Sequence, residues 1–205
     1  MTPAPLKALM VDVDGVVLVP QPGGWGRDLE ADLGLSLPRL QSEFFAQHWP
    51  DIEVGRAGLE ERLAPVLARI APHLSCEALT RYWFEKDANP DASLLEDLRR
   101  VRAAGLQVHL ATVQEHRRAA YIWQTLRFNE QFEAIHYSAA LGAKKPHSAF
   151  FRAIELRTGL AGQELMLIDD RVENVEGAQI CGWRAALWDG RRTLFEILTD
   201  EGFSL

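Results

Sequence analysis

The residues with the clearest potential for chemistry are Asp12 and Asp14, two carboxylates separated by one residue and followed by Gly15. Alternate residues of an extended chain point to the same side, so both carboxylates face one region. Their mutual repulsion is costly unless a cation lies between them, and Mg²⁺ and Ca²⁺ prefer carboxylate oxygens. Gly15 permits a tight turn directly behind the pair. This pattern indicates a cation-binding carboxylate site, although a calcium loop or an ordinary acidic turn can have the same residues.

A second acidic pair, Asp169 and Asp170, follows an apolar run near the end of the chain. Two acids directly after an apolar strand are unfavourable without a metal ion, a lysine or a helix N-terminus nearby. The chain offers two adjacent lysines, Lys144 and Lys145, followed by Pro146. Adjacent lysines are usually a solvated surface pair. Because Pro146 restricts the direction of the chain, Lys145 is the stronger candidate for a residue that faces inward.

Thr112 ends another apolar run. A hydroxyl at a strand end can donate a hydrogen bond to a phosphoryl oxygen, as can the backbone N–H groups that follow it. A strand-terminal threonine alone is usually structural. Beside a carboxylate nucleophile, a lysine and a metal ion, however, it fits the positioning and charge stabilisation that phosphoryl transfer requires.

The elements that must bring these residues together are predicted from short apolar runs with helical patterns between them. The predicted strands are 8–11, 108–112, 134–137, 165–168 and 184–188. Helical spacing marks the segments around 94–101, 120–126, 150–154 (with Ser148 as a candidate cap and Gly159 as the stop) and 175–179. Alternating strands and helices predict an α/β fold, a parallel sheet flanked by helices on both faces. The polar segments then meet at the carboxyl edge of the sheet, where such folds bind ligands.

The stretch from about residue 17 to 89 has helical periods and no convincing strand. We interpret it as an all-helical cap inserted after the first strand, with the α/β core formed by 1–16 and 90–205. Gly23 and Gly24 at the entry and Asn89-Pro90 at the exit are candidate hinges. Pro65 lies within one helical stripe and is expected to kink or divide that helix.

Composition sets outer limits on the function. The chain has 205 residues and a formal net charge of −7, which argues against a nucleic-acid groove or an anionic membrane as the main partner. The first apolar run is short and ends in an acid, unlike a signal peptide or a membrane span, so a cytoplasmic location is the default expectation. Cys76 and Cys181 are expected to be two reduced thiols, although one long-range disulfide is an alternative. A monomer or homodimer is expected.

Taken in order, these motifs resemble those of the haloacid dehalogenase-like hydrolase superfamily. The shared motifs are Asp12-Val13-Asp14-Gly15-Val16-Val17, the strand-terminal Thr112, Lys145-Pro146 and Ile168-Asp169-Asp170 with Asn174. The resemblance covers nearly the whole chain, including a small helical cap. It implies a Rossmann-like core and a magnesium-dependent phosphatase that hydrolyses a small phosphate monoester, such as a sugar phosphate, through an aspartyl-phosphate.

The resemblance also implies a role for each motif residue. Asp12 matches the nucleophile and a metal ligand, and Asp14 matches the general acid/base, with a backbone carbonyl that binds the metal. Thr112 matches the hydroxyl that binds the phosphoryl group, and Lys145 matches the motif lysine. Asp170 matches the main metal-binding acid. Asp169 would orient Lys145 or a metal-bound water, and Asn174 falls on a second acid of the motif. Val113 departs from the pattern, because many relatives have Asn there.

Candidate substrate contacts come from both parts of the chain. In the core they are Gly15 and Val113, and in the predicted cap they are Trp25, Arg27 and Arg56. The segment around Arg56 resembles a cap segment of sugar-phosphate phosphatases, and an arginine there could bind a charged or hydroxylated leaving group. The alternative for both arginines is a solvated surface position, and for Trp25 it is packing.

Three other functions remain compatible with parts of the pattern. A phosphotransferase or phosphomutase would use the same aspartyl-phosphate chemistry with a different acceptor. A phospho-receiver domain also combines acids, a threonine and a lysine around magnesium, but there the acidic pair comes first in the chain. A non-catalytic binding protein is the third alternative, and the intact set of acids and lysine argues against it.

Overall fold

The computed structural model describes residues 4–203, and its centre is a parallel five-stranded sheet with the order β3-β2-β1-β4-β5. The strands are β1 (Ala8–Val11), β2 (Gln107–Thr112), β3 (Ile135–Tyr137), β4 (Leu165–Asp169) and β5 (Arg184–Leu187). β1 pairs with β2 on one side and with β4 on the other. The predicted fold class is therefore confirmed, and the strand order reverses at β1, where ligands bind in open α/β sheets.

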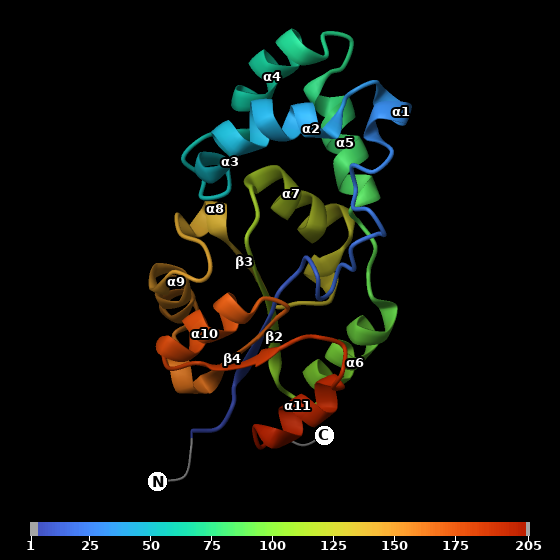
Figure 1. Cartoon of the computed structure of the whole chain (residues 1–205). Coiled ribbons are helices and arrows are strands. Elements are labelled where there is room, and N and C mark those ends of the chain that lie inside the picture. Colours follow the sequence, from blue (N-terminus) through green and yellow to red (C-terminus); the bar gives the residue numbers. More distant parts are fainter. Residues whose placement is uncertain (1–3, 204–205) are drawn as a thin grey trace.

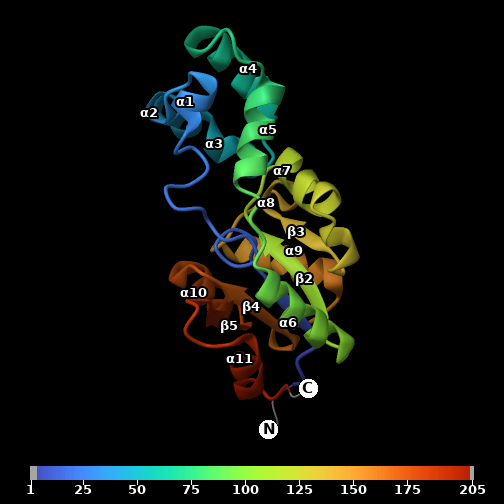
Figure 2. The ribbon, with the colours of Figure 1, turned by 90° about the vertical axis from the view of Figure 1, so that its right-hand side faces the viewer.

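Helices cover both faces of the sheet (Figures 1 and 2). They are α6 (Ala92–Ala103), α7 (His116–Ala120, continued by a π-helical turn to Thr125), α8 (Ser138–Leu141), α9 (Ser148–Thr158), α10 (Val172–Ile180) and α11 (Leu194–Asp200). Successive β1 residues point to opposite faces. Leu9 and Val11 belong to the hydrophobic cluster that includes α6 and α11, and Met10 to the cluster with α9 and α10. Ser148, predicted as a cap, is instead the first residue of α9.

The chain between β1 and β2 forms a second group of helices, which we call the helical lobe (residues 29–86). It contains α1 (Leu29–Leu33), α2 (Leu37–Leu40), α3 (Ala46–Ile52), α4 (Leu59–Ile70) and α5 (Cys76–Lys86). A π-helical turn, Gln41–Phe45, joins α2 and α3 into one helical run. The lobe has its own hydrophobic cluster and lies beyond the carboxyl edge of the sheet (Figure 1).

Pro65 does not divide its helix, because α4 is continuous from Leu59 to Ile70. The proline removes one backbone hydrogen bond, but the buried face of α4, which includes Leu63 and Val66, packs into the lobe and holds the helix together.

Cys76 and Cys181 are free thiols, as expected. Within residues 4–203, no helix has the length and apolar character needed to cross a membrane.

The two segments that connect the lobe to the core run side by side. Val19 N donates to Asn89 O at 2.9 Å, and Asp91 N donates to Val17 O at 3.0 Å. A third link comes from Arg118 on α7, whose side chain is buried and donates at 2.8 Å to the carbonyl oxygens of Phe84 and Asp87. The core therefore holds the end of α5 through a buried guanidinium group.

His109 on β2 and His136 on β3 form a buried stacked pair with ring centroids 5.3 Å apart. Burial lowers the pKa of His136 to about 4 and also lowers the pKa of His109. Nδ1 of His136 is buried without a hydrogen-bond partner among the described residues, so a proton there would have no acceptor.

This histidine pair predicts a loss of stability in mild acid. An unfolded histidine has a pKa near 6.5, so between about pH 6.5 and 4 the unfolded state binds more protons than the folded state. The free energy of unfolding therefore decreases as the pH is lowered through this range. For His136 the full loss is about 3 kcal/mol. Urea unfolding at pH 7.5 and 4.5 should show that His136→Gln has a clearly smaller pH dependence than the wild type. Equal dependence in both proteins would contradict the assignment.

Candidate active site

Asp12 and Lys145 form the centre of the site. Asp12 directly follows β1 and is only 6% exposed. Its Oδ1 accepts a hydrogen bond from Val13 N at 2.7 Å and lies 3.0 Å from Nζ of Lys145. The same Nζ donates to Ala111 O at 2.8 Å and contacts Oδ2 of Asp169 at 2.5 Å. One buried ammonium group thus joins the carboxyl ends of β1, β2 and β4.

The two acids after β4 have different surroundings. Asp169 is fully buried, and its Oδ1 accepts from Asn174 Nδ2 at 2.9 Å and from Arg171 N at 3.0 Å. Both of its oxygens are therefore occupied, and its contact with Lys145 orients that lysine. Asp170 is exposed and has no ion pair within residues 4–203. The acid free to bind another group is Asp170.

Gly15 allows the first motif to pass close to Asp170. Its φ is +86°, a conformation that favours glycine, and a Cβ atom there would lie 2.2 Å from Oδ2 of Asp170. No larger residue fits without displacing the carboxylate. The sequence predicted Gly15 as a substrate contact, and the structure places it where it keeps Asp170 next to the turn after Asp12.

The charges of this cluster fit a divalent cation. Asp12, Asp169 and Asp170 each have an oxygen within 4.8 Å of the others, and only Lys145 among the described cations contacts the cluster. Burial raises the pKa of Asp12 to about 7 despite the lysine, and burial followed by the charge of Asp169 raises the pKa of Asp170. Three carboxylates balanced by one ammonium group leave two negative charges. The oxygen donors and this charge suit Mg²⁺.

Asp14 is held by a residue that the sequence analysis missed. Gln114, which is 4% exposed, donates from Nε2 to Oδ2 of Asp14 at 2.6 Å. Burial by the surrounding protein raises the pKa of Asp14, and Arg118 acts in the opposite direction. The side chain still keeps an exposed face. A carboxyl group with a raised pKa is suited to donating a proton near neutral pH.

The position of Gln114 also bears on the departure at Val113. Thr112, the last residue of β2, is buried, and Val113 is half-buried. The amide that many relatives have directly after the threonine is absent, but Gln114 supplies one beside Asp14. Alternate residues of an extended chain share a side, so the sequence could have placed the Gln114 side chain on the same side as Thr112.

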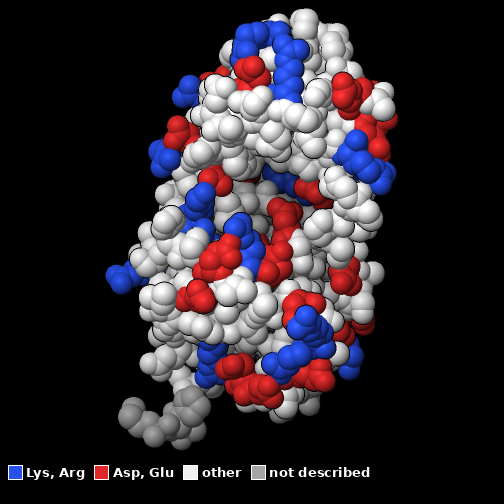
Figure 3. All heavy atoms as spheres, in the orientation of Figure 1, with Lys and Arg blue, Asp and Glu red and all other residues white. Residues whose placement is uncertain are grey.

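The end of α3 contacts the core next to this site. Ser138 Oγ accepts a hydrogen bond from Gln114 N at 3.0 Å and donates to the carbonyl oxygen of Glu53. The buried Glu53 carboxylate pairs with Nζ of Lys144 at 2.5 Å. Between the lobe and the core, Figure 3 shows a hollow with acidic and basic side chains gathered on its core side. Sequence analysis identified neither Glu53 nor Ser138, because both depend on long-range contacts.

The three substrate contacts predicted between residues 17 and 89 all have partners within that segment. Trp25 stacks on Trp83 with ring centroids 5.2 Å apart. Arg27 pairs with Asp28 at 2.9 Å, and Arg56 pairs with Asp51 at 2.8 Å. The structure brings none of these side chains into contact with the core motifs, and both guanidinium groups are already paired with a neighbouring carboxylate.

Acids and a lysine thus converge at the carboxyl edge of a parallel α/β sheet. The family model for haloacid dehalogenase-like hydrolases matches residues 6–182. The chain belongs to this family, as the order of its motifs predicted.

Two relatives are similar to the chain over most of its length. A sesquiterpene phosphatase of Aspergillus oryzae is 25% identical over 182 residues, which are 86% of this chain and 86% of the relative. A predicted hydrolase of the same family from Porphyromonas gingivalis has a similar fold, with a TM-score of 0.80, 17% identity, and coverage of 98% of this chain and 100% of the other.

Two further solved structures share the fold. One is a family enzyme of Bacteroides thetaiotaomicron in complex with magnesium and inorganic phosphate, with a TM-score of 0.79, 16% identity, and coverage of 94% of this chain and 98% of the other. The other is the L-2-haloacid dehalogenase of Xanthobacter autotrophicus, with a TM-score of 0.63, 17% identity, and coverage of 95% and 81%. The fold therefore accommodates both phosphate-binding enzymes and dehalogenases, and the choice between them rests on the site.

Proposed function

We propose that this protein is a magnesium-dependent phosphatase that hydrolyses a small phosphate monoester through an aspartyl-phosphate on Asp12. The observation that carries the proposal is the second carboxyl group, Asp14, held by Gln114 and with a raised pKa. Cleavage of a carbon–halogen bond needs no protonated leaving oxygen, whereas cleavage of an alkyl phosphate ester does. The phosphatase relative and the neighbour that binds magnesium and phosphate support the same choice.

The first step forms a bond between Asp12 and phosphorus. Oδ1 of Asp12 is engaged by Val13 N and Lys145, which leaves Oδ2 to attack. As the new P–O bond forms, the bond to the ester oxygen breaks, and Asp14 gives that oxygen its proton. Lys145 and Thr112 provide donors where negative charge accumulates on phosphorus-bound oxygens.

The second step releases phosphate. Asp14, now a carboxylate, takes a proton from a water molecule whose oxygen attacks phosphorus. The bond between phosphorus and Asp12 breaks, and both acids return to their starting states. Asp12, Asp170 and the carbonyl of Asp14 would hold Mg²⁺, which supplies charge stabilisation to the phosphoryl oxygens. An acceptor alcohol in place of water would give the phosphotransferase or mutase reaction, the alternative within the same chemistry.

We further propose residues 17–89 as a cap domain that excludes water from this site. The support is the pairing of its two connecting segments at Val17 and Asp91, and the contact of Glu53 with the core. Closure of such a domain over an active site sequesters the reaction from water, with a few loop positions acting as hinges.

A phosphate-release screen with magnesium present tests the proposed function. The substrates should include acetyl phosphate, sugar phosphates, nucleotides, short phospho-acids and, following the name of the Aspergillus relative, a sesquiterpenyl phosphate. EDTA should remove the activity and added magnesium should restore it. Absence of release from every ester, or release that EDTA does not change, would overturn the proposal.

The two acids after β4 should respond differently to replacement. Asp170→Ala removes a proposed metal ligand, so the magnesium concentration for half-maximal activity should rise at least about tenfold with little change in Tm. Asp169→Ala leaves Lys145 buried with one carboxylate fewer, so it should lower Tm more and weaken magnesium binding less. Magnesium titration and thermal unfolding of both variants measure this. A larger loss of magnesium affinity in Asp169→Ala would mean that the two roles are exchanged.

A further inference from the structure

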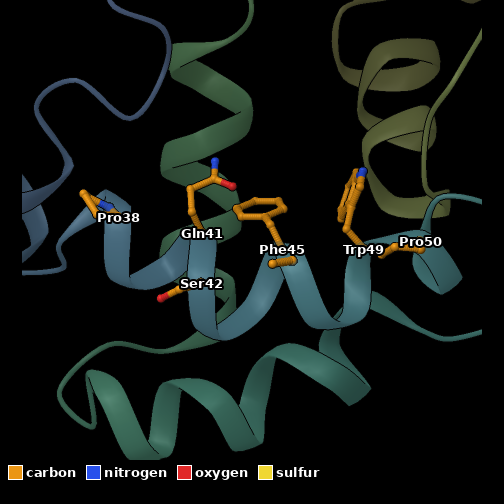
Figure 4. Close-up of a pocket in the computed structure, with 7 residues that line it drawn as sticks. Pro38, Gln41, Ser42, Phe45, Trp49 and Pro50 are labelled. Carbon is orange, nitrogen blue, oxygen red and sulfur yellow. The ribbon is translucent and has the colours of Figure 1, made fainter.

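An open groove runs along the α2–α3 helical run of the lobe, with a volume of about 710 Å³. It is lined by Pro38, Gln41, Ser42, Phe45, Ala46, Trp49 and Pro50. These positions recur every three or four residues, so they share one face of the run. In Figure 4 the Gln41, Phe45 and Trp49 side chains point to one side of the run, away from α4 and toward the side where α7 of the core lies.

The groove borders the hydrophobic interior of the lobe, because Phe45 and Trp49 pack against Trp83 with ring centroids 5.5 Å apart in each pair. The opposite face of the same run carries Leu40, Phe44 and Ile52, which are buried in the cluster that includes α4. Phe45 and Trp49 remain partly exposed, and their rings meet edge to face at 5.3 Å. One side of each ring therefore packs into the lobe, and the exposed part of each ring forms the apolar surface of the groove.

The helical run that carries this groove ends beside the candidate active site. The helical run ends at Glu53, which pairs with Lys144 and accepts a hydrogen bond from Ser138. Lys144 adjoins Lys145, and Ser138 contacts Gln114, the partner of Asp14. A substrate with its phosphate at Asp12 could thus extend its leaving group along the groove.

The charge distribution restricts what the groove can hold. No charged side chain lines it, and its polar side chains are only one amide and one hydroxyl, Gln41 and Ser42. Arg27 and Arg56, the arginines predicted to bind a charged or hydroxylated leaving group, are paired with neighbouring aspartates. A second phosphate would find no cation in this groove, and a sugar would find few hydrogen-bonding partners.

We infer that the groove binds an apolar leaving group, so that the preferred substrates are phosphate monoesters of hydrophobic alcohols. This inference rests on the proposed function and names the substrate class of the same site. The volume of the groove lies within the range of about 300–1,000 Å³ that small-molecule sites occupy. Aromatic surface with a few polar groups is also the usual lining of such sites.

A homologous series of n-alkyl phosphates, from ethyl to octyl, tests the inference by kcat/KM. Full burial of one methylene is worth about fourfold in binding, so partial burial in an open groove is worth about twofold. Octyl phosphate, with six more methylenes, should therefore exceed ethyl phosphate by roughly sixtyfold. Glucose 6-phosphate should rank with the short esters. An equal kcat/KM for all chain lengths would overturn the inference.

Two exposed alanines of the lobe provide a matched pair of variants. Ala46→Gln places a polar side chain in the groove, and Ala31→Gln places the same side chain on α1, outside it. Ala46→Gln should flatten the chain-length dependence and leave acetyl phosphate, which lacks a long leaving group, unchanged. Ala31→Gln should behave as the wild type. Trp49→Ala should act like Ala46→Gln, but it also removes a packed ring. The same chain-length dependence in both alanine variants would contradict the groove.

Binding of alkylphosphonates, whose C–P bond is not hydrolysed, separates this inference from the proposed function. Calorimetry with magnesium should show affinity that rises with chain length in the wild type and in Ala31→Gln, but not in Ala46→Gln. If the protein binds the series in this way yet releases phosphate from no ester, the proposed function is wrong and the groove is still a binding site for an apolar group. If it hydrolyses acetyl phosphate without any chain-length effect on binding or rate, the groove does not bind the leaving group and the proposed function is retained.

Discussion

Asp12→Asn should abolish turnover, with a loss of at least about ten-thousandfold in kcat, the scale on which removal of a nucleophile acts. An amide is a poor nucleophile and a poor ligand for magnesium. The substitution keeps the shape of the side chain and leaves an oxygen to accept the hydrogen bond from Val13 N. Phosphate release under single-turnover conditions, with equal amounts of folded protein, measures the effect.

The stability of this variant provides its control. Lys145 keeps its contacts with Asp169 and with Ala111 O, so Asp12→Asn should remain folded, and thermal unfolding should confirm this. Phosphate release at the wild-type rate from a folded Asp12→Asn protein would show that another group is the nucleophile.

Asp14→Asn should lower the rate by at least about a hundredfold, the usual contribution of general acid/base catalysis. The magnesium affinity should change little, because the proposed ligand at this residue is its backbone carbonyl. The loss in the first step should depend on the leaving group. An alkyl oxygen needs the proton from Asp14, whereas p-nitrophenolate leaves without it.

Burst measurements of the first step with p-nitrophenyl phosphate and with an alkyl phosphate test this assignment. The alkyl ester should lose clearly more rate than the aryl ester. Equal losses would mean that Asp14 is not the acid, and its contact with Gln114 would then have only a structural role.

The strands and the four core motifs could be predicted because their signals are local. Each strand is a short apolar run that ends in a turn, and all five were placed within one or two residues. The motif residues Asp12, Thr112 and Asp169 each stand at a strand end. In a parallel sheet those ends share one edge, so strand positions alone imply that the motifs converge.

The lobe was predicted less completely because its helices are short and irregular. α1 has only five residues, and α3 contains Pro50, which normally argues against a helix interior. The π-helical turn that joins α2 to α3 departs from the usual helical period. The bounds of these short helices therefore could not be read from regular spacing alone.

The sequence by itself determined the fold class, the order of the motifs and the types of the reactive groups, because these depend on local patterns and on parallel strand order. Only the tertiary structure decided which groups pair. Gln114 reaches Asp14 across 100 positions, and Glu53 reaches Lys144 across 91. The tertiary structure also assigned Asp169 to the lysine and left Asp170 free, although the two acids are adjacent in the chain. Such contacts depend on the direction of each side chain after the chain has folded, which residue type and spacing do not specify.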